Sequence, residues 1–275
     1  MSRNESRTQG ARQAVPPSVP SQPQHEASSN AFNFVVPTEV VDLPSKGLFY
    51  GEGHPLYGLD SIEVKHMTAK EEDILTSASL LKKGVALDKM LQSIIVDKRI
   101  KVEELLVGDK NALLIASRVY GYGAHYNVQV PCPTCNSVFE HTFDLNQIEA
   151  KEVEDAQGVS KTENNTFVVT LPKSNFEIEY RLLLSKDEHE LSNKTSGGSL
   201  ELLKLITVSV NGQTDTFYIE RALQSMPILD VSVLKRAYAK TMPDIDMTQD
   251  VECTSCGETT VMGVPLDAGF FWPDS

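Results

Sequence analysis

Four cysteines, arranged as two matching pairs, are the residues of this sequence whose type and spacing predict chemistry. Cys132 and Cys135 stand in VPCPTCNSVF, and Cys253 and Cys256 stand in VECTSCGETT. Thiolates at C-x-x-C spacing are ligands of structural zinc, and two such pairs supply the four ligands of a tetrahedral site. The pattern therefore predicts one structural Zn²⁺ per chain, held by all four sulfurs.

The residues around the two pairs also match. Val130 and Val251 each lie two residues before the first cysteine of a pair, and Leu145 and Leu266 each lie ten residues after the second. Each pair is therefore expected in a strand, a tight turn and a return strand. The pairs are separated by 117 residues, which is far more than in a compact zinc ribbon. We expect a split ribbon with a strand-and-helix unit inserted between its halves.

Other interpretations of the cysteines stay open at this point. Two pairs of buried free thiols fit the same residues, because free cysteine often packs as a small apolar side chain. A redox pair is disfavoured, since a redox-active C-x-x-C needs a strand-to-helix setting. His125 and His141 flank the first pair and are candidates for outer-shell donors. Four thiolates leave no open coordination position, so the predicted zinc is structural rather than catalytic.

Composition and charge narrow the class of protein. The chain has 275 residues and a net charge of −13, from 25 basic and 38 acidic residues. An acidic surface repels phosphate backbones and anionic lipid, so neither nucleic acid nor a membrane is the expected partner. We see no signal peptide and no long apolar run, which favours a reducing cytosol where cysteines bind metal. No nucleophile elbow, metal-hydrolase histidine pair or nucleotide-binding fingerprint is present, so we expect no enzymatic activity.

The periodicity predicts an α+β fold, with a small helical N-terminal unit and antiparallel strands closed by the split four-cysteine zinc ribbon. The predicted segments are a disordered arm (1–30), an extended Pro/Gly-broken docking segment (31–67), a helical unit (68–125), the first zinc-ribbon half (126–147), an inserted strand-helix unit (148–245), and the second zinc-ribbon half with an aromatic C-terminus (246–275). The arm is too polar to bury a core, and we expect it to become ordered only on partners.

Several local signals define the predicted elements. Thr68 and Glu71 form a capping box that opens a helix, whose apolar face continues to Leu81 before Gly84. Asp109 is predicted to cap the last of three helices in 68–121. The dipeptide Asn211-Gly212 predicts a two-residue hairpin turn between strands.

Two apolar segments are candidates for contacts with other proteins. In LPSKG, Pro44 presets its φ and Gly47 permits a positive φ, so Lys46 is expected at the tip of a turn. Packing is expected for Leu43, Leu48 and Phe49. The C-terminal GFFWPDS either docks on the body or contacts a partner through its aromatic side chains. The predicted partner-binding residues are Leu43, Pro44, Lys46, Gly47, Leu48, Phe49, Phe270, Phe271 and Trp272.

The segment VVDLPSKGLFYGEGHPL, residues 40–56, resembles a segment of baseplate proteins from T4-like contractile-tailed bacteriophages. It is followed by MTAKEEDIL, a helical opening that is also similar to that family, and the resemblance extends to about residue 145. It implies a structural subunit of the central baseplate hub, assembled in the host cytoplasm, located in the virion and bound to other tail and baseplate proteins. An assembly chaperone absent from the virion and a zinc-ribbon factor that binds nucleic acid or polymerase are the alternatives.

Overall fold

The described part of the computed structural model comprises residues 35–151, 153, 156–193, 198–266 and 268–271. Within these residues every strand pair is antiparallel, and helices are interspersed with the strands, which confirms the α+β class. The predicted disordered arm and Trp272 lie outside the described residues. None of the helices described is long and apolar enough to cross a membrane.

A two-stranded sheet and four helices make up the N-terminal part of the fold. They are β1 (Thr38–Asp42), β2 (Ser61–Lys65), α1 (Ala69–Thr76), α2 (Ala78–Lys82), α3 (Ala86–Ile94) and α4 (Val107–Tyr122), with the 3₁₀ turn η1 (Val102–Glu104) before α4. β2 buries alternate residues, Ile62 and Val64, because successive side chains of a strand point to opposite faces. α3 buries Met90, Leu91 and Ile94, which recur at helical spacing.

The predicted capping box starts α1, but the helix ends earlier than predicted. Glu71 Oε2 accepts from the Thr68 backbone N–H at 3.0 Å and from the Thr68 hydroxyl at 2.6 Å. Ser77 then adopts an extended conformation, with ψ 106°, and separates α1 from α2. Leu81 consequently lies on a second short helix and is 47% exposed, so the prediction of one apolar face through Leu81 was wrong.

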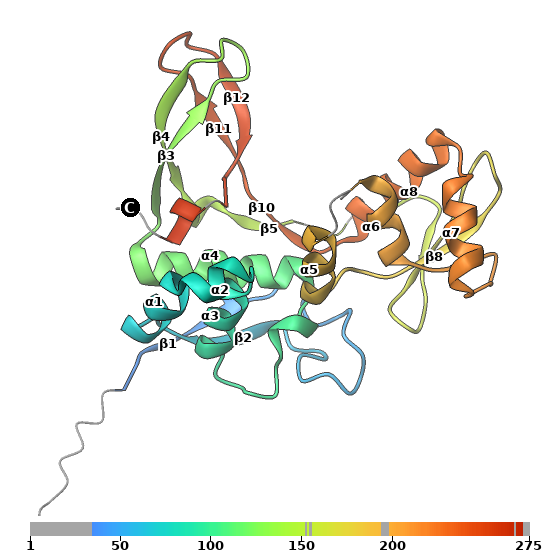
Figure 1. Ribbon diagram of the computed structural model, residues 1–275, viewed down its shortest axis with the longest axis horizontal. Helices are drawn as coiled ribbons and strands as arrows, with labels where there is room; N and C mark the ends of the chain where they lie inside the picture. The colour runs from blue at the N-terminus through green and yellow to red at the C-terminus, as the bar shows by residue number, and fades with distance from the viewer. Residues whose placement is uncertain (1–34, 152, 154–155, 194–197, 267, 272–275) are drawn as a thin grey trace, which may run out of the picture. The chain divides into compact units, whose positions relative to one another are not determined.

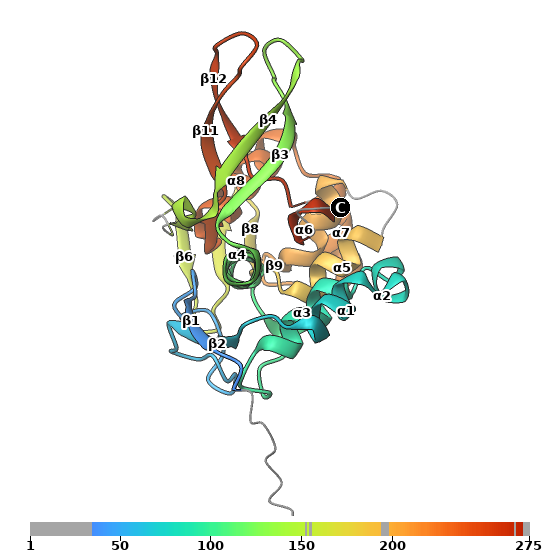
Figure 2. The ribbon, with the colours of Figure 1, turned by 90° about the vertical axis from the view of Figure 1, so that its left-hand side faces the viewer.

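Two hairpins carry the cysteine turns. The first consists of β3 (His125–Pro131) and β4 (Val138–Asp144), and the second of β11 (Thr248–Glu252) and β12 (Thr259–Gly263). They lie side by side in both ribbon views (Figures 1 and 2). A short ladder between β5 (Glu149–Lys151) and β10 (Asp244–Asp246), which was not predicted, pairs the segment that leaves the first hairpin with the one that enters the second.

The residues between the hairpins form the inserted unit. Its sheet has the order β6 (Val159–Lys161), β7 (Phe167–Thr170), β8 (Glu177–Tyr180) and β9 (Thr207–Val210), and its helices are α5 (Ser185–Asn193), α6 (Ser199–Ile206), α7 (Thr216–Gln224) and α8 (Ile228–Thr241). Asn211 and Gly212 both have positive φ, 52° and 74°, as the predicted turn requires. No strand follows that turn, because Asp215 caps α7 by accepting from Tyr218 N at 2.9 Å.

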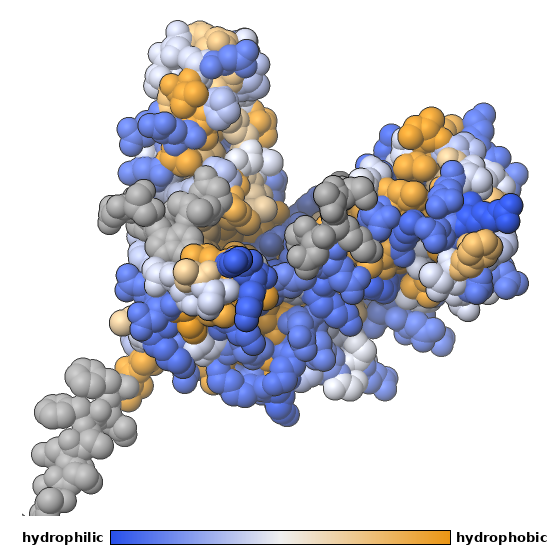
Figure 3. Space-filling view, viewed as in Figure 1, coloured by the Kyte–Doolittle hydropathy of each residue, from blue (hydrophilic) through white to orange (hydrophobic). Residues whose placement is uncertain are grey.

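One continuous apolar core connects the helical part, the two hairpins as far as Cys132 and Cys253, and the inserted unit. Two further 3₁₀ turns contribute to it, η2 (Leu145–Gln147) and η3 (Ala268–Phe271). In the inserted unit, the Phe167 ring stacks on Tyr180 with centroids 5.5 Å apart. Hydrophilic residues cover most of the face shown in Figure 3, as expected for an acidic chain.

Candidate metal centre

The apolar face of the first hairpin sets where its cysteine turn lies. Tyr126 pairs with Phe143, and Val130 pairs with Phe139, and all four side chains are buried. In the second hairpin Val251 is 1% exposed. Because residues alternate between the two faces of a strand, these buried residues fix the register of each hairpin and place the cysteine turn at its end. The predicted strand–turn–strand arrangement is present on both sides.

The two cysteine turns have the same backbone geometry. In each, the N–H of the first cysteine donates to the carbonyl five residues later, at 2.8 and 2.9 Å, and its carbonyl accepts from the N–H four residues later, at 2.9 and 2.8 Å. The residue after the second cysteine is left-handed in both turns, with φ 58° at Asn136 and 72° at Gly257. Asparagine and glycine are the residues that adopt this conformation most readily.

The four sulfur atoms converge from the two hairpins. All four lie within 4.8 Å of one another. Cys132 Sγ is 3.8 Å from Cys256 Sγ, and Cys135 Sγ is 3.8 Å from Cys253 Sγ, so two close sulfur–sulfur contacts run between the hairpins. Four thiolates at about 2.3 Å from a tetrahedral zinc would lie about 3.8 Å apart. The sulfurs are thus spaced as ligands of one ion, well beyond the length of a disulfide.

The donor set fits structural zinc. All four ligand atoms are sulfur, and neither His125 nor His141 belongs to the group of converging ligand atoms found in the described residues. Cys132 and Cys253 are buried, whereas Cys135 and Cys256 are exposed. A hydrogen bond with the Ser137 hydroxyl is the main cause that lowers the pKa of Cys253 to about 6. Against a hydrogen bond from the Glu258 backbone, burial and the contacts with Cys135 and Cys253 raise the pKa of Cys256 to about 12, so the thiolate is favoured at Cys253 and the thiol at Cys256.

The opposite ends of the hairpins are held together without cysteine. The side-chain amide of Gln249 in β11 donates to the Asp144 carbonyl at 2.7 Å and accepts from the Asp144 N–H at 3.2 Å. It thus forms both hydrogen bonds that a neighbouring strand would form. The hairpins therefore meet at two levels, at the sulfurs of the turns and, at the other end, at Gln249 and the β5–β10 ladder.

Two of the C-terminal aromatic residues, Phe270 and Phe271, pack inside the protein. Phe270 and Phe271 are 2% and 3% exposed, and the Phe270 ring meets Tyr126 edge-on at 5.2 Å. The buried guanidinium of Arg118 donates from Nε to the Phe270 carbonyl at 2.7 Å and from an NH group to the Gly123 carbonyl at 2.7 Å. The sequence left two alternatives for this segment, docking on the body or contact with a partner. Phe270 and Phe271 dock on the body.

The LPSKG turn is anchored by a buried carboxylate that the sequence analysis assigned to another role. Asp109 Oδ1 accepts from Ser45 N at 3.0 Å, and its Oδ2 accepts from the Ser45 hydroxyl at 2.6 Å and from Tyr50 Oη at 2.7 Å. Asp109 lies within α4 and is fully buried, so the prediction that it caps the helix was wrong; Leu106 occupies the cap position. Burial raises the pKa of Asp109.

We call Ser45, Tyr50 and Asp109 the carboxylate cluster. Their contacts determine which residues of the turn are accessible. Leu43, Pro44 and Gly47 are buried, and Lys46 projects with φ 49° as predicted for the tip of the turn. Leu48 is 58% exposed, so the prediction that it packs was wrong. A Cβ on Gly47 would lie 2.5 Å from backbone atoms of Leu59, which explains why the turn needs glycine there.

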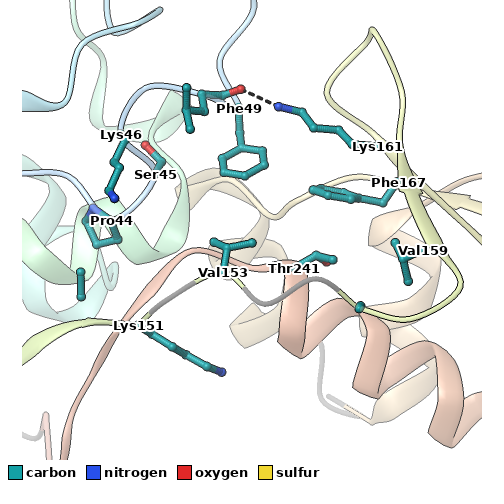
Figure 4. Close-up of a pocket in the computed structure, with 13 residues that line it drawn as sticks. Pro44, Ser45, Lys46, Phe49, Lys151, Val153, Val159, Lys161, Phe167 and Thr241 are labelled. Carbon is teal, nitrogen blue, oxygen red and sulfur yellow. Dashed lines mark hydrogen bonds between the residues drawn. The ribbon is translucent and has the colours of Figure 1, made fainter.

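A pocket of about 640 Å³ lies beside the turn, between it and the start of the inserted unit. Figure 4 shows Lys46, Phe49 and Lys161 around it. The Lys161 ammonium donates to the Leu48 carbonyl at 2.9 Å and lies 4.4 Å from the centroid of the Phe49 ring. Four of the predicted partner-binding residues line this pocket: Pro44, Lys46, Leu48 and Phe49.

The sequence predicted the candidate metal ligands but not the residues that support the two hairpins and the LPSKG turn. The cysteine spacing identified the four ligands, whereas Ser45, Tyr50 and Gln249 carried no motif. Asp109 stands beside Lys110 and Asn111 within the largely apolar stretch LLVGDKNALLI, and a carboxylate there was a usable signal, because a buried charge needs partners. That signal would have directed attention to Asp109 as a packing residue.

Comparison with known proteins identifies the family. Searches of curated proteins and of solved structures each gave no match. A family model described as T4 bacteriophage base plate protein matches residues 37–271, which include both hairpins, the LPSKG turn and the inserted unit. The match extends well beyond the 40–145 region of the resemblance noted in the sequence. The chain belongs to the T4 bacteriophage base plate protein family.

Proposed function

We propose that the protein is a non-enzymatic structural subunit of the central hub of a phage baseplate, and that a single zinc ion clamps its two hairpins together. The observation that carries the clamp is the convergence of four sulfurs, all within 4.8 Å, from two hairpins far apart in the sequence. Family membership supports the location in the virion tail. Four thiolates would complete the coordination shell, so the ion would supply rigidity and not a reactive water.

The clamp would act by closing the inserted unit into a loop. Residues Cys135 and Cys253 bracket 117 residues, so the ion would join the two ends of a long segment. Because the unfolded chain does not bring the four sulfurs together, zinc bound by the folded state would stabilise that state by its binding free energy. The result would be a body whose binding surfaces keep a fixed geometry during assembly.

Elemental analysis of the purified protein tests the clamp. We expect about one zinc per chain, and loss of the metal when Cys253 is replaced by serine. Protein prepared with zinc in the medium that carries no stoichiometric metal would contradict the proposal.

Contacts with other baseplate proteins are proposed for the exposed part of the LPSKG turn. Lys46 and Leu48 are exposed and Phe49 is half-buried, and all three border the pocket in Figure 4. An exposed leucine beside a lysine-lined pocket is the kind of surface on which a partner's side chain can dock. Docking there would leave the buried residues of the turn as its support.

Leu48→Asp tests this surface with little effect on the fold. The side chain is 58% exposed, so the free energy of unfolding should change by less than about 0.5 kcal/mol. Incorporation into baseplates in infected cells should fall strongly, because a charge would be placed in the contact. Leu81→Asp, at another exposed leucine on α2, is the matched control. Equal incorporation of both variants would place the contact elsewhere.

The hub assignment and its alternatives are separated by where the protein is found. A hub subunit must be present in purified virions at low copy number, and quantitative mass spectrometry measures this directly. An assembly chaperone would be absent from them. A nucleic-acid-binding factor would retain DNA or RNA at low salt, which a net charge of −13 disfavours.

A further inference from the structure

The hydroxyl of Ser137 lies between the two cysteine turns. Its Oγ is 2.9 Å from Cys135 Sγ in its own hairpin and 3.6 Å from Cys253 Sγ in the other hairpin. These two sulfurs form one of the close pairs that join the hairpins, 3.8 Å apart. One hydroxyl therefore contacts a sulfur from each half of the split site.

Within the part of the chain that the structure describes, the second close pair of sulfurs, Cys132 and Cys256, has no equivalent hydroxyl neighbour. Ser137 and Glu258 stand at matching positions, two residues after the second cysteine of their turns, and the backbone N–H of each donates to that cysteine. Beyond the backbone the turns differ, because Ser137 adds a hydroxyl donor and Glu258 adds a carboxylate. Among the described residues, no side-chain hydroxyl hydrogen-bonds the pair Cys132–Cys256. The two turns are alike in backbone and different in side-chain chemistry.

We propose that Ser137 is a positioning residue of the metal centre, whose hydroxyl donates its proton to the Cys135 thiolate and shares it with the Cys253 thiolate. This role rests on the proposed zinc clamp. Thiolate ligands carry no proton of their own, so the hydroxyl is the donor when metal is bound. A donor to both sulfurs reduces their mutual repulsion and holds them at the spacing that the ion requires. Outer-shell hydrogen bonds of this kind orient metal ligands and raise metal affinity.

Zinc affinity of the full-length protein, measured by competition with a chromophoric chelator, tests the proposal. Ser137→Ala should weaken binding about tenfold, as the loss of an outer-shell partner typically does. Ser137→Thr keeps the hydroxyl and should stay close to the wild type. Ser255→Ala is the matched control, because Ser255 lies in the other turn and its hydroxyl makes no hydrogen bond within the described residues. Equal affinity of wild type and Ser137→Ala would overturn the role, and a wild type that binds no zinc would overturn the clamp as well.

Cobalt substitution separates a hydrogen bond to sulfur from a merely structural effect. Removing a donor from a thiolate makes the sulfur more electron-rich, so the thiolate-to-Co²⁺ charge-transfer bands of Ser137→Ala should move to lower energy. The d–d bands should keep the intensity of a tetrahedral site, which shows that all four ligands remain. Ser137→Thr and Ser255→Ala should give wild-type bands. Unshifted charge-transfer bands in Ser137→Ala would contradict a hydrogen bond from its hydroxyl.

Discussion

The cysteine turns and the carboxylate cluster both join segments that are distant in the sequence, but they do so by different means. Four sulfurs meet at the ends of two hairpins, and two of the four cysteines are exposed. Ser45, Tyr50 and Asp109 meet in the interior, where each donor already has its acceptor. In the proposed clamp an ion completes the first junction, whereas the chain itself completes the second. On this proposal, one junction depends on the supply of metal and the other does not.

We therefore expect the two junctions to stabilise different parts of the molecule. The carboxylate cluster holds the LPSKG turn against α4 and so shapes the surface around Leu48, with or without metal. The proposed zinc clamp secures the hairpins and closes the inserted unit on the rest. Perturbing one junction should therefore leave the other intact, and the following variants test that separation.

Loss of zinc should have the largest effect. Cys253→Ser should lower the melting temperature of the body by about 10 °C, because the free energy of zinc binding no longer stabilises the folded state. Differential scanning calorimetry on zinc-loaded wild type, chelated wild type and the variant makes the measurement. The last two should melt together. A variant that loses zinc but melts as the wild type does would refute the clamp.

Asp109→Ala should have the second largest effect. It should lower the free energy of unfolding by about 3 kcal/mol, because it leaves three hydrogen-bond donors without their acceptor in the interior. Denaturant unfolding measures the loss. Zinc content should stay at one per chain, which is the sign that the two junctions are separate. Loss of zinc in a folded Asp109→Ala protein would show instead that they are coupled.

The pH dependence of stability sharpens the role of Asp109. Burial raises its pKa in the folded state, so the folded protein holds this proton more tightly than the unfolded chain does. The resulting stabilisation is complete below the unfolded pKa of about 3.9 and is lost as pH rises through the folded pKa. Asp109→Asn lacks the titration, so its stability relative to the wild type should improve as pH rises. A difference that is constant with pH would mean that Asp109 titrates normally.

Gly47→Ala should lower the free energy of unfolding by about 2 kcal/mol or more, since it combines a left-handed backbone with a Cβ 2.5 Å from the Leu59 backbone. Gly58→Ala is the matched control. Gly58 has nearly the same φ, 69° against 67°, and open space around its Cβ position. The difference between the two variants in urea unfolding isolates the close packing of the turn. Equal losses would show that only the backbone conformation matters.

Gln249→Ala should have the smallest effect on stability. It should lower the free energy of unfolding by about 1 kcal/mol, because it removes two hydrogen bonds at a partly buried site. Its effect should be larger in chelated protein than in zinc-loaded protein, since the two fastenings hold the same pair of hairpins. Urea unfolding of the wild type and of Gln249→Ala, each with and without zinc, gives the four free energies that this comparison needs. Strict additivity would show that the two ends of the hairpins act independently.

Local patterns predicted the parts of the structure that local physics decides. Alternating apolar residues located the strands around each cysteine pair, and the C-x-x-C spacing located the ligands. The Thr68–Glu71 capping box marked a helix start correctly because both partners are three residues apart.

Two of the errors arose where distant residues decide the outcome. Asp109 has the residue type of a helix cap, but its carboxylate is taken up by Ser45 and Tyr50, which lie about sixty residues earlier. One error had a local cause: the Asn211-Gly212 turn was correct, but the helix cap at Asp215, which accepts from Tyr218 N, was missed, and a helix follows instead of a second hairpin strand. The β5–β10 ladder joins segments too short and too far apart to give a strand signal.

X-ray absorption at the zinc edge of the purified protein would reveal the ligands of the proposed ion. We expect one shell of four sulfur atoms at about 2.3 Å, because two hairpins each contribute two thiolates. The same shell should be absent from Cys253→Ser. A mixed shell that contains nitrogen or oxygen from histidine, carboxylate or water would contradict the four-cysteine clamp.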